Sequence, residues 1–439
     1  MYKFSKFTRE YVMEDIHVFY NMVTDSIVTV TPDAFDIIAN NYNNIDNIRD
    51  IHPDLFDIML TSNCLVKESV KTEANEIVKC WEHEDSVPEH IKITIIPTIQ
   101  CNLRCWYCYE NHDTTEVISS SRIASIMKYI ERTAQLNSVK KIIIDFFGGE
   151  PLLCFDNCIK PIVLYAEKVC QKYSKGLGIA FTTNGVLLTE DKCDFLSGIN
   201  ALTSFQITFD GDESSHNAVR FLKGGIGTYR TIIHNVLYGI SKKLHFTIRF
   251  NYTHKNHSSY QSTIDELLNN ISNTDKQLID FSFHKVWQEQ ETSEIESSMS
   301  THRQTVGKKG YNYNIPVNWG SVTRCYADNP NDIVINHNGN IYKCTARDFT
   351  PERAEGVLKS DGTILWNKNS ILRRQLMYGS EYCKNCKIFP ICHGGCSQNK
   401  LERLPETNSC IFNYTENQKE LLVKNRVIEL LQQYLINNK

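Results

Sequence analysis

The segment Thr98–Glu110, TIQCNLRCWYCYE, most constrains how this chain can fold and what it can do. It places Cys101, Cys105 and Cys108 on one loop, directly after an apolar run, Ile91–Thr98, that is typical of a buried strand. Three thiolates so close together can hold three irons of a cubane cluster and leave the fourth iron open to a ligand. A zinc knuckle and a disulfide are the alternatives, but structural zinc needs four ligands and no fourth one lies nearby.

Length, charge and hydropathy exclude several classes of protein. A chain of 439 residues with 41% hydrophobic residues can form roughly two to three cored domains. The net charge of -4 and the lack of a sustained basic block argue against a nucleic-acid partner. No uncharged apolar run approaches the roughly 20 residues that span a bilayer, so we expect a soluble cytoplasmic protein without a membrane partner. In that compartment the 16 cysteines are better explained as metal ligands than as disulfides.

Residues 1–85 are predicted to form a small domain of their own. The β-rich runs are His17–Tyr20, Ser26–Val30 and Leu65–Lys67, and the helices are Asp33–Asn40, Ile45–Ile51 and Pro53–Thr61. This order of a β-hairpin and a winged-helix-like bundle resembles the leader-peptide recognition domain of many enzymes that modify ribosomally made peptides. The resemblance implies that a strand edge between Lys3 and Val30 binds a peptide by adding a strand. A cap domain without a ligand is the alternative, and residues 70–88 are predicted to be a charged helical linker.

Residues 86–290 alternate between strands and helices. The predicted strands are Lys92–Ile96, Lys140–Phe146, Gly178–Thr182, Thr203–Phe209, Leu244–Asn251 and Leu278–Lys285, and helices include Ser120–Thr133, Asn157–Tyr173, Thr228–Ile240 and Ser259–Asn269. Six successive β/α units predict an α/β fold with a parallel sheet, curved into a partial (β/α)6 barrel. The chemistry of such a sheet belongs at the carboxyl ends of its strands.

A polar or glycine-rich motif follows each of the first four predicted strands. After the cysteine loop come Phe147-Gly148-Gly149-Glu150-Pro151, Thr182-Thr183-Asn184-Gly185 and Thr208-Phe209-Asp210-Gly211, and then His216-Asn217-Ala218-Val219-Arg220. The glycines permit close approach of the backbone to a ligand, Glu150 offers a carboxylate to a cation, and Arg220 can bind a carboxylate. Each motif alone is a common turn sequence. Their order and their shared position at strand ends indicate one site.

Together, CNLRCWYC, FFGGEP, TTNG and TFDG resemble the radical S-adenosylmethionine (SAM) superfamily over roughly residues 90–290. The resemblance implies that Cys101, Cys105 and Cys108 hold a [4Fe-4S] cluster whose open iron binds the amino and carboxylate groups of SAM. One electron from the cluster would cleave SAM to methionine and a 5′-deoxyadenosyl radical. The implied cofactor contacts are Gly148, Gly149 and Glu150 to the amino group, Arg220 to the carboxylate and Tyr107 to the adenine, with Asn184, Thr208 and Asp210 as further contacts.

A second set of cysteines lies near the C-terminus. It follows a polar segment, residues 288–313, whose composition predicts a mobile linker or a substrate-lining loop. In the predicted division into domains, the linker spans residues 291–320. The seven cysteines of this set are Cys325, Cys344, Cys383, Cys386, Cys392, Cys396 and Cys410. Asn338-Gly339 predicts a hairpin turn that brings the first two close together. Zinc is the main structural alternative to an iron-sulfur cluster.

The spacing of these seven cysteines resembles the SPASM extension of peptide-modifying radical SAM enzymes, here at residues 321–439. The resemblance implies two auxiliary [4Fe-4S] clusters, one held by Cys383, Cys386, Cys392 and Cys410 and the other by Cys325, Cys344 and Cys396. Some relatives have an eighth cysteine, but Ile315–Arg324 contains none. We therefore expect an open or non-cysteine fourth position that could bind a substrate thiolate, unless Cys64, Cys80 or another distant residue fills it.

The remaining segments are predicted to be structural. Cys154, Cys158, Cys170 and Cys193 lie in helical stretches and are expected to pack as small apolar side chains. Residues 413–437 predict one helix that packs back on the core, with a partner helix as the alternative.

Three functions remain open. The first is a peptide maturase that installs a thioether or carbon–carbon cross-link in a ribosomally made precursor peptide with a leader segment. The second is an anaerobic sulfatase-type maturase that forms formylglycine; in those relatives an aspartate follows the second SPASM cysteine, whereas Thr345 stands here. The third is a non-catalytic iron-sulfur scaffold that binds peptides. The resemblance also implies a reducing electron donor such as a flavodoxin or ferredoxin.

Overall fold

The computed structural model describes residues 1–13, 16–110, 112, 115–290, 292–313, 324–404 and 409–437. Internal contacts divide the chain into two compact units. The first unit contains Met1–Ser86, Val317–Pro330 and Ile371–Lys439, and the second contains Val87–Pro316 and Asn331–Ser370. The division into domains at 1–85, 86–290, 291–320 and 321–439 that the sequence suggested stays a prediction.

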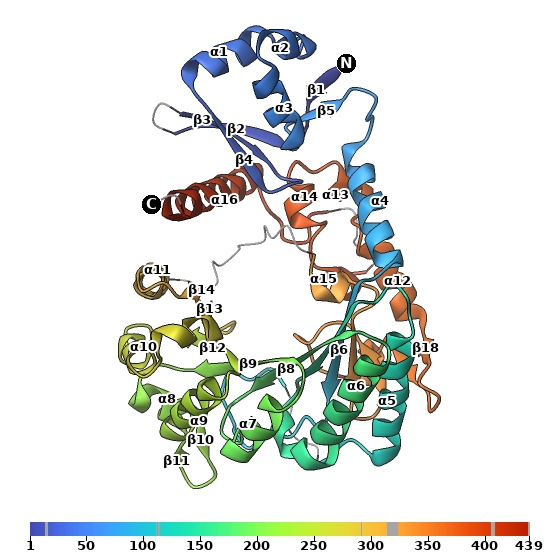
Figure 1. Ribbon diagram of the computed structural model, residues 1–439, viewed down its shortest axis with the longest axis vertical. Helices are drawn as coiled ribbons and strands as arrows, with labels where there is room; N and C mark the ends of the chain where they lie inside the picture. Colours follow the sequence, from blue (N-terminus) through green and yellow to red (C-terminus); the bar gives the residue numbers. More distant parts are fainter. Residues whose placement is uncertain are drawn as a thin grey trace. The chain divides into compact units, whose positions relative to one another are not determined.

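The second unit is built on one mixed sheet of eleven strands (Figure 1). In spatial order they are β14 (Asn312–Tyr313), β13 (Ile279–Lys285), β12 (His245–Tyr252), β9 (Leu202–Phe209), β8 (Gly176–Thr183), β7 (Lys141–Phe146), β6 (His90–Ile96), β15 (Ile333–Asn336), β16 (Asn340–Tyr342), β17 (Gly356–Leu358) and β18 (Ile364–Trp366). Six of these strands pair in parallel with one another, namely β6, β7, β8, β9, β12 and β13. They are the six strands that the sequence predicted.

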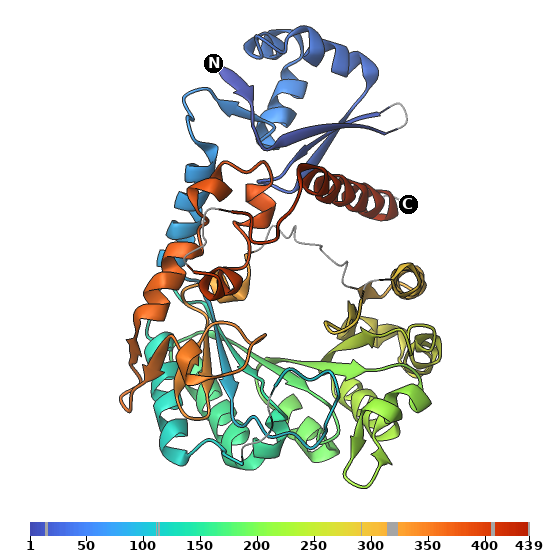
Figure 2. The same ribbon diagram turned by 180° about the vertical axis from the view of Figure 1, so that it is seen from behind.

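Helices line one face of this sheet (Figures 1 and 2). They are α5 (Ser120–Ala134), α6 (Lys160–Lys172), α7 (Glu190–Ser197), α9 (Tyr229–Ser241) and α10 (Tyr260–Asn269). Four phenylalanines, Phe146, Phe181, Phe205 and Phe246, are register partners on adjacent strands, and their rings stack at centroid distances of 5.2, 4.9 and 5.2 Å. The four cysteines predicted to be structural are all buried in this core, which confirms that prediction.

The sheet extends beyond the predicted six strands on both sides. The strand β14 pairs in parallel with β13, and β15 pairs in parallel with β6. The strands β15 and β16 pair in antiparallel fashion and form the hairpin that was predicted around Gly339. Gly339 has the positive φ, +88°, that the turn requires. The hairpin adds its strands to the edge of the parallel sheet.

The polar segment predicted as a mobile linker or loop instead contains the helix α11 (Ser293–Lys308). Thr292 caps it by accepting a hydrogen bond from the Ile295 amide, and Ile295, Met299 and Val306 form a narrow buried stripe. These few apolar side chains are enough to hold the helix in place, because only one stripe of the helix contacts the core. Residues 314–320 of the predicted linker, and residues 315–323 of the stretch without a cysteine, lie outside the described part of the chain.

The N-terminal part of the first unit has the elements that the sequence predicted. An antiparallel sheet of order β2-β3-β4 is formed by β2 (Thr8–Met13), β3 (Ile16–Asn21) and β4 (Ser26–Val30). It is followed by α1 (Pro32–Asn40), α2 (Asp46–Ile51), α3 (Pro53–Thr61) and β5 (Leu65–Lys67), which pairs with β1 (Tyr2–Phe4). The strands β1, of three residues, and β2, of six residues, were not predicted.

The ends of the chain share one core in the first unit. Val18 and Tyr20 of β3 pack in the same apolar cluster as Phe389, Val423 and Val427. The cluster also includes residues of α4 (Glu73–Ser86), while α16 (Glu416–Asn437) supplies the two valines. The predicted C-terminal helix thus packs back on the protein, against the N-terminal sheet and the cysteine-rich segment.

Candidate functional site

The three-cysteine loop begins where β6 ends. Cys101 and Cys105 are partly buried, Cys108 is exposed, and burial raises the pKa of the Cys101 thiol to about 12. The Cys101 sulfur accepts the Leu103 amide at 3.4 Å and lies 3.8 Å from the side-chain nitrogen of Asn184. Three thiols held on one loop and approached by N–H donors match the donor set of an iron-sulfur cluster.

The Gly148-Gly149 pair lets the loop after β7 lie directly against the cysteine loop. Gly148 has φ of +118°, and a Cβ atom there would meet the Thr98 carbonyl oxygen at 2.5 Å. A Cβ atom on Gly149 would lie 2.5 Å from the carbonyl carbon of Gln100, and Glu150 donates its amide to the Gln100 oxygen at 2.8 Å. The structure therefore gives these glycines a role in packing two segments of the chain. Their contact with a cofactor stays a prediction.

Glu150 is completely buried and its carboxylate holds neighbouring loops together. It accepts hydrogen bonds from the Leu152 amide at 2.9 Å, the Thr183 hydroxyl at 2.8 and 2.9 Å, and the Asn184 amide at 2.9 Å. Burial raises its pKa, and these donors oppose the rise. Asn184, fixed in this way, reaches Asn102 of the cysteine loop at 2.7 Å.

Tyr107, Asp210 and Arg220 form one buried network, although 113 positions separate the first from the last. The Tyr107 hydroxyl donates to both Asp210 oxygens at 2.8 Å, and Arg220 donates Nε to Asp210 at 2.5 Å and Nη2 to Tyr107 at 2.7 Å. Burial lowers the pKa of Arg220, but Cys105, Tyr107 and Asp210 outweigh it, so the guanidinium stays charged. Thr208 pairs with Arg249 in the neighbouring strand β12.

His216 helps to position Arg220 through a chain of hydrogen bonds. It lies in α8 (Glu213–Val219), is fully buried, and accepts the Asp210 amide at Nδ1 at 3.4 Å. Its Nε2 lies 3.1 Å from the Thr228 hydroxyl, which donates to the Arg220 carbonyl at 2.8 Å. Burial holds its pKa well below the usual value, so the ring is neutral, as this hydrogen-bond chain requires.

Sequence reasoning missed two polar side chains at this site. Asn251, near the end of β12, donates to the Tyr107 hydroxyl at 3.2 Å. Glu110, two residues after Cys108, has both carboxylate oxygens buried without a hydrogen-bond partner among the described residues. Burial raises the pKa of Glu110 to about 7, with His112 opposing the rise and Asp348 adding to it. Neither residue belongs to a recognisable sequence pattern, so no signal could have found them.

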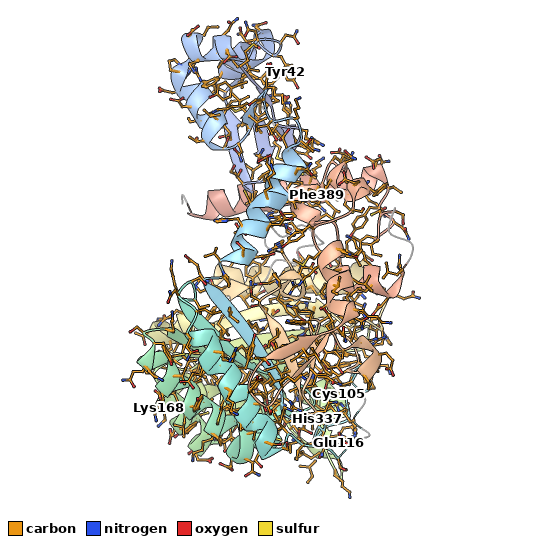
Figure 3. All side chains as sticks on the ribbon, turned by 90° about the vertical axis from the view of Figure 1, so that its right-hand side faces the viewer. Tyr42, Cys105, Glu116, Lys168, His337 and Phe389 are labelled. Carbon is orange, nitrogen blue, oxygen red and sulfur yellow. The ribbon has the colours of Figure 1, made fainter. Side chains whose placement is uncertain are left out.

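The hairpin β15–β16 is tied to the segment that follows the cysteine loop. His337 lies 3.0 Å from Glu116, and both are labelled in Figure 3, as is Cys105. The Tyr109 hydroxyl donates to the Thr345 carbonyl at 2.7 Å. The residue after Cys344 thus meets the cysteine loop through its backbone.

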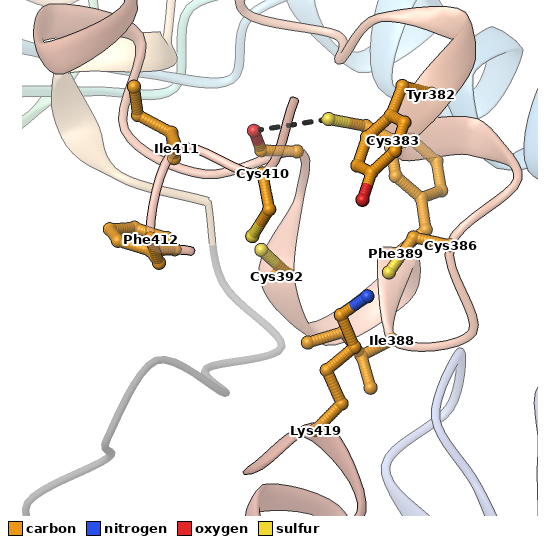
Figure 4. Close-up of a pocket in the computed structure, with 11 residues that line it drawn as sticks. Tyr382, Cys383, Cys386, Ile388, Phe389, Cys392, Cys410, Ile411, Phe412 and Lys419 are labelled. Carbon is orange, nitrogen blue, oxygen red and sulfur yellow. Dashed lines mark hydrogen bonds between the residues drawn. The ribbon is translucent and has the colours of Figure 1, made fainter. Parts of the chain in front are cut away.

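In the first unit, four cysteines line one pocket (Figure 4). They are Cys383, Cys386, Cys392 and Cys410, and the other lining residues are Tyr382, Ile388, Phe389, Gly394, Ile411, Phe412 and Lys419. Burial, followed by the negative charge of the other three thiols, raises the pKa of Cys392 to about 12. Four converging thiols in an apolar pocket match the donor set of a cluster with full cysteine ligation. They are the four cysteines that the SPASM resemblance implies for one auxiliary cluster, and their role as ligands stays a prediction.

The other predicted auxiliary ligands are distributed over both units. Cys325 and Cys396 belong to the first unit and Cys344 to the second, so their ligand set stays a prediction. Cys396 caps α15 (Ser397–Glu402), and Ser397 hydrogen-bonds Asp328 of the 3-10 helix that follows Cys325. Of the two suggested replacements for a missing ligand, Cys64 is buried among the N-terminal helices and Cys80 is exposed on α4.

Within the described residues, no group of three or more His, Cys, Asp or Glu side chains is arranged to hold a single metal ion. A four-iron cluster is larger than one ion and takes ligands that lie farther apart than those of a single metal. None of the helices in the described ranges has the length and apolar character of a membrane span.

Residues 95–266 match the family model of the Radical SAM superfamily. The chain is 27% identical over 218 residues to the radical SAM cyclopropyl synthase TigE of Paramaledivibacter caminithermalis, a match that covers 42% of this chain and 43% of the synthase. It is 22% identical over 354 residues to the cysteine-type anaerobic sulfatase-maturating enzyme of Clostridium novyi, with coverage of 71% and 89%.

Among solved structures, Streptococcus suis SuiB bound to its precursor peptide SuiA aligns with a TM-score of 0.53 at 14% identity. The alignment covers 94% of this chain and all of SuiB. At this identity the alignment shows a shared fold.

Proposed function

We propose that this chain, which contains a radical SAM domain at residues 95–266, is a maturase that modifies a ribosomally made precursor peptide. The modification would be a cross-link, either a thioether or a carbon–carbon bond. When bound at the three-cysteine loop, a [4Fe-4S] cluster supplies the site for SAM and the electron that cleaves it. The observation that carries the proposal is the network that joins Tyr107, inside this loop, to Asp210 and Arg220.

The residues of this network suit the polar end of SAM. Arg220 uses Nε for Asp210 and Nη2 for Tyr107, which leaves further N–H groups of the guanidinium for a carboxylate. Asp210 keeps the guanidinium in place, so the site is organised before the ligand arrives. The Glu150 carboxylate fixes Asn184 beside Cys101. We propose that Glu150 acts mainly as a positioning residue and that backbone groups of residues 148–150 receive the amino group.

A peptide substrate is supported by the N-terminal sheet. Its outer strands are β2 and β4, and the edge strand β2 carries Val12, which is 62% exposed. A leader segment could extend the sheet by pairing with an edge through backbone hydrogen bonds. The structure of SuiB bound to its precursor peptide, which aligns over 94% of this chain, supports a peptide as the partner.

The two edges can be separated by substitution. Val12→Lys alters β2 and Thr29→Lys alters β4, and both positions are exposed. Fluorescence anisotropy with the labelled leader segment of a candidate precursor peptide, sought as a short open reading frame beside the gene, would show weaker binding for only one variant. Equal, tight binding by both variants would remove the sheet edges as the binding surface.

The type of modification is tested by coexpressing the chain with that candidate precursor peptide and measuring the peptide by mass spectrometry. We expect the loss of two hydrogens for each cross-link, with fragmentation blocked between the joined residues. A Cys101→Ala, Cys105→Ala, Cys108→Ala variant should leave the peptide unchanged. A modified peptide from that variant would contradict the proposal.

Formylglycine formation is the second candidate, because the alignment with the sulfatase-maturating enzyme covers 89% of that protein. Thr345 lacks the carboxylate that this reaction uses in such enzymes, and its backbone carbonyl is bound by Tyr109. A peptide with a sulfatase-type cysteine motif decides between the candidates. Conversion of its cysteine to an aldehyde that reacts with a hydrazide probe would favour the second.

A further inference from the structure

Lys419 places a buried positive charge in the pocket of four cysteines. It lies near the start of α16, is only 5% exposed, and lines the pocket together with Cys383, Cys386 and Cys392. Figure 4 shows its ammonium group pointing into the pocket, on the side of Cys386. Nearly all other lining side chains are thiols or apolar groups. A lysine is rarely buried in such surroundings without a partner of opposite charge.

One partner is visible at the rim. Lys419 donates to Glu416 at 2.6 Å, and the Glu416 side chain is 68% exposed. Glu416 also pairs with Lys387 at 3.1 Å, so its single charge is shared between two lysines. An ammonium group has three N–H donors, and this contact uses one. Glu416 is its one hydrogen-bond partner among the described residues, and Figure 4 places the ammonium group beside Cys386.

Four thiolates around a four-iron core give an anionic cluster, and reduction adds one more negative charge. A cation held in an apolar pocket interacts with that charge far more strongly than it would in water. The cation therefore stabilises the reduced cluster more than the oxidised one. Charge and hydrogen bonds near the sulfurs are general determinants of the potential of such clusters.

We propose that Lys419 is a positioning residue for the cluster held by Cys383, Cys386, Cys392 and Cys410, and that its ammonium group raises the reduction potential of that cluster. The inference rests on the proposed ligand set. Lys419 makes the cluster a better acceptor of one electron, which leaves it with one additional negative charge next to the ammonium group. The packing role of the lysine stem alone would not change the potential.

The test is a potentiometric titration of full-length protein, reduced stepwise with dithionite and followed by electron paramagnetic resonance. The background carries Cys101→Ala, Cys105→Ala and Cys108→Ala, so that the signals come from the C-terminal cysteines. Lys419→Met should shift one midpoint to lower potential, while Lys419→Arg keeps it. Lys424→Met is the matched control, because Lys424 is an exposed lysine of the same helix and its loss should leave every midpoint unchanged.

Glu416→Gln gives the opposite prediction and keeps every residue that lines the pocket. Loss of this rim carboxylate leaves Lys419 less neutralised, so the same midpoint should rise. An unchanged midpoint in Lys419→Met with equal iron content would overturn the role of Lys419. If Lys419→Met does not hold iron, an unchanged midpoint in Glu416→Gln would overturn it instead. A background protein that binds no iron at the four cysteines would overturn the cluster itself, which distinguishes the two failures.

Discussion

Replacing Gly149 with alanine should destabilise the second unit by about 3 kcal/mol and impair the three-cysteine loop. A Cβ atom at this position would lie 2.5 Å from the carbonyl carbon of Gln100. That is about 1 Å inside an ordinary carbon–carbon contact. Because the obstacle is backbone, no side chain can rotate away, and overpacking of this kind costs about 1–3 kcal/mol. The displaced backbone leads directly into Cys101, so the loop must move with it.

Gly176→Ala is the matched control for this substitution. Gly176 begins β8, is exposed, and a Cβ atom there would meet its nearest neighbour at an ordinary 3.5 Å. We expect its unfolding free energy to stay within about 0.5 kcal/mol of the parent. Urea unfolding of the iron-free protein in reducing buffer measures both variants by far-UV circular dichroism.

Cluster binding gives a second measurement for Gly149→Ala. After anaerobic reconstitution and reduction, addition of SAM should change the electron paramagnetic resonance signal of the cluster at the three-cysteine loop. We expect a clear change in Gly176→Ala and a much smaller one in Gly149→Ala. A Gly149→Ala protein with unchanged stability and a full response to SAM would refute the conclusion that these two loops are packed in contact.

Three further changes are predicted from single contacts. Tyr107→Phe removes the hydroxyl that joins Asp210 and Arg220 and should cost about 1–3 kcal/mol, and unaltered urea unfolding would contradict this. Asp85→Ala removes the carboxylate that pairs with Arg324, whose side chain is 12% exposed, and should cost about 3 kcal/mol in the first unit; a melting temperature equal to the parent's would disprove it. Burial lowers the pKa of His284 to about 3, so its neutral form stabilises the fold fully above pH 6.5 and this contribution falls as pH drops from 6.5 toward 3. Between pH 7 and pH 5, the unfolding free energy of His284→Gln should therefore fall by about 2 kcal/mol less than that of the parent. Parallel profiles of unfolding free energy against pH for the two proteins would count against this.

The alternation of strands and helices in the second unit was readable because each buried strand is a short apolar run that ends in polar or glycine residues. The predicted Thr203–Phe209 corresponds to β9 at Leu202–Phe209, and the predicted Ser259–Asn269 to α10 at Tyr260–Asn269. The helix α11 was missed since its buried stripe is too narrow to raise the apolar content of its sequence. The strand β2 was missed because it lies at a sheet edge with mixed polarity.

The candidate site was predictable only in part. Cysteine spacing and the motifs after the strands identified the segments that meet at the carboxyl ends of the parallel strands. The contacts of Tyr107 with Asp210 and Asn251 bridge 103 and 144 positions, and no local pattern encodes such partners. The buried ammonium of Lys419 was equally hidden, because its sequence neighbours look like those of any exposed helix.

The central claim is that the three-cysteine loop supports radical chemistry with SAM. The most direct measurement is the formation of 5′-deoxyadenosine by reconstituted, dithionite-reduced protein incubated with SAM, separated by liquid chromatography. We predict steady formation by the parent and none by the variant in which Cys101, Cys105 and Cys108 are alanine. No 5′-deoxyadenosine from parent protein with a fully loaded first cluster would contradict the claim and favour a non-catalytic iron-sulfur scaffold.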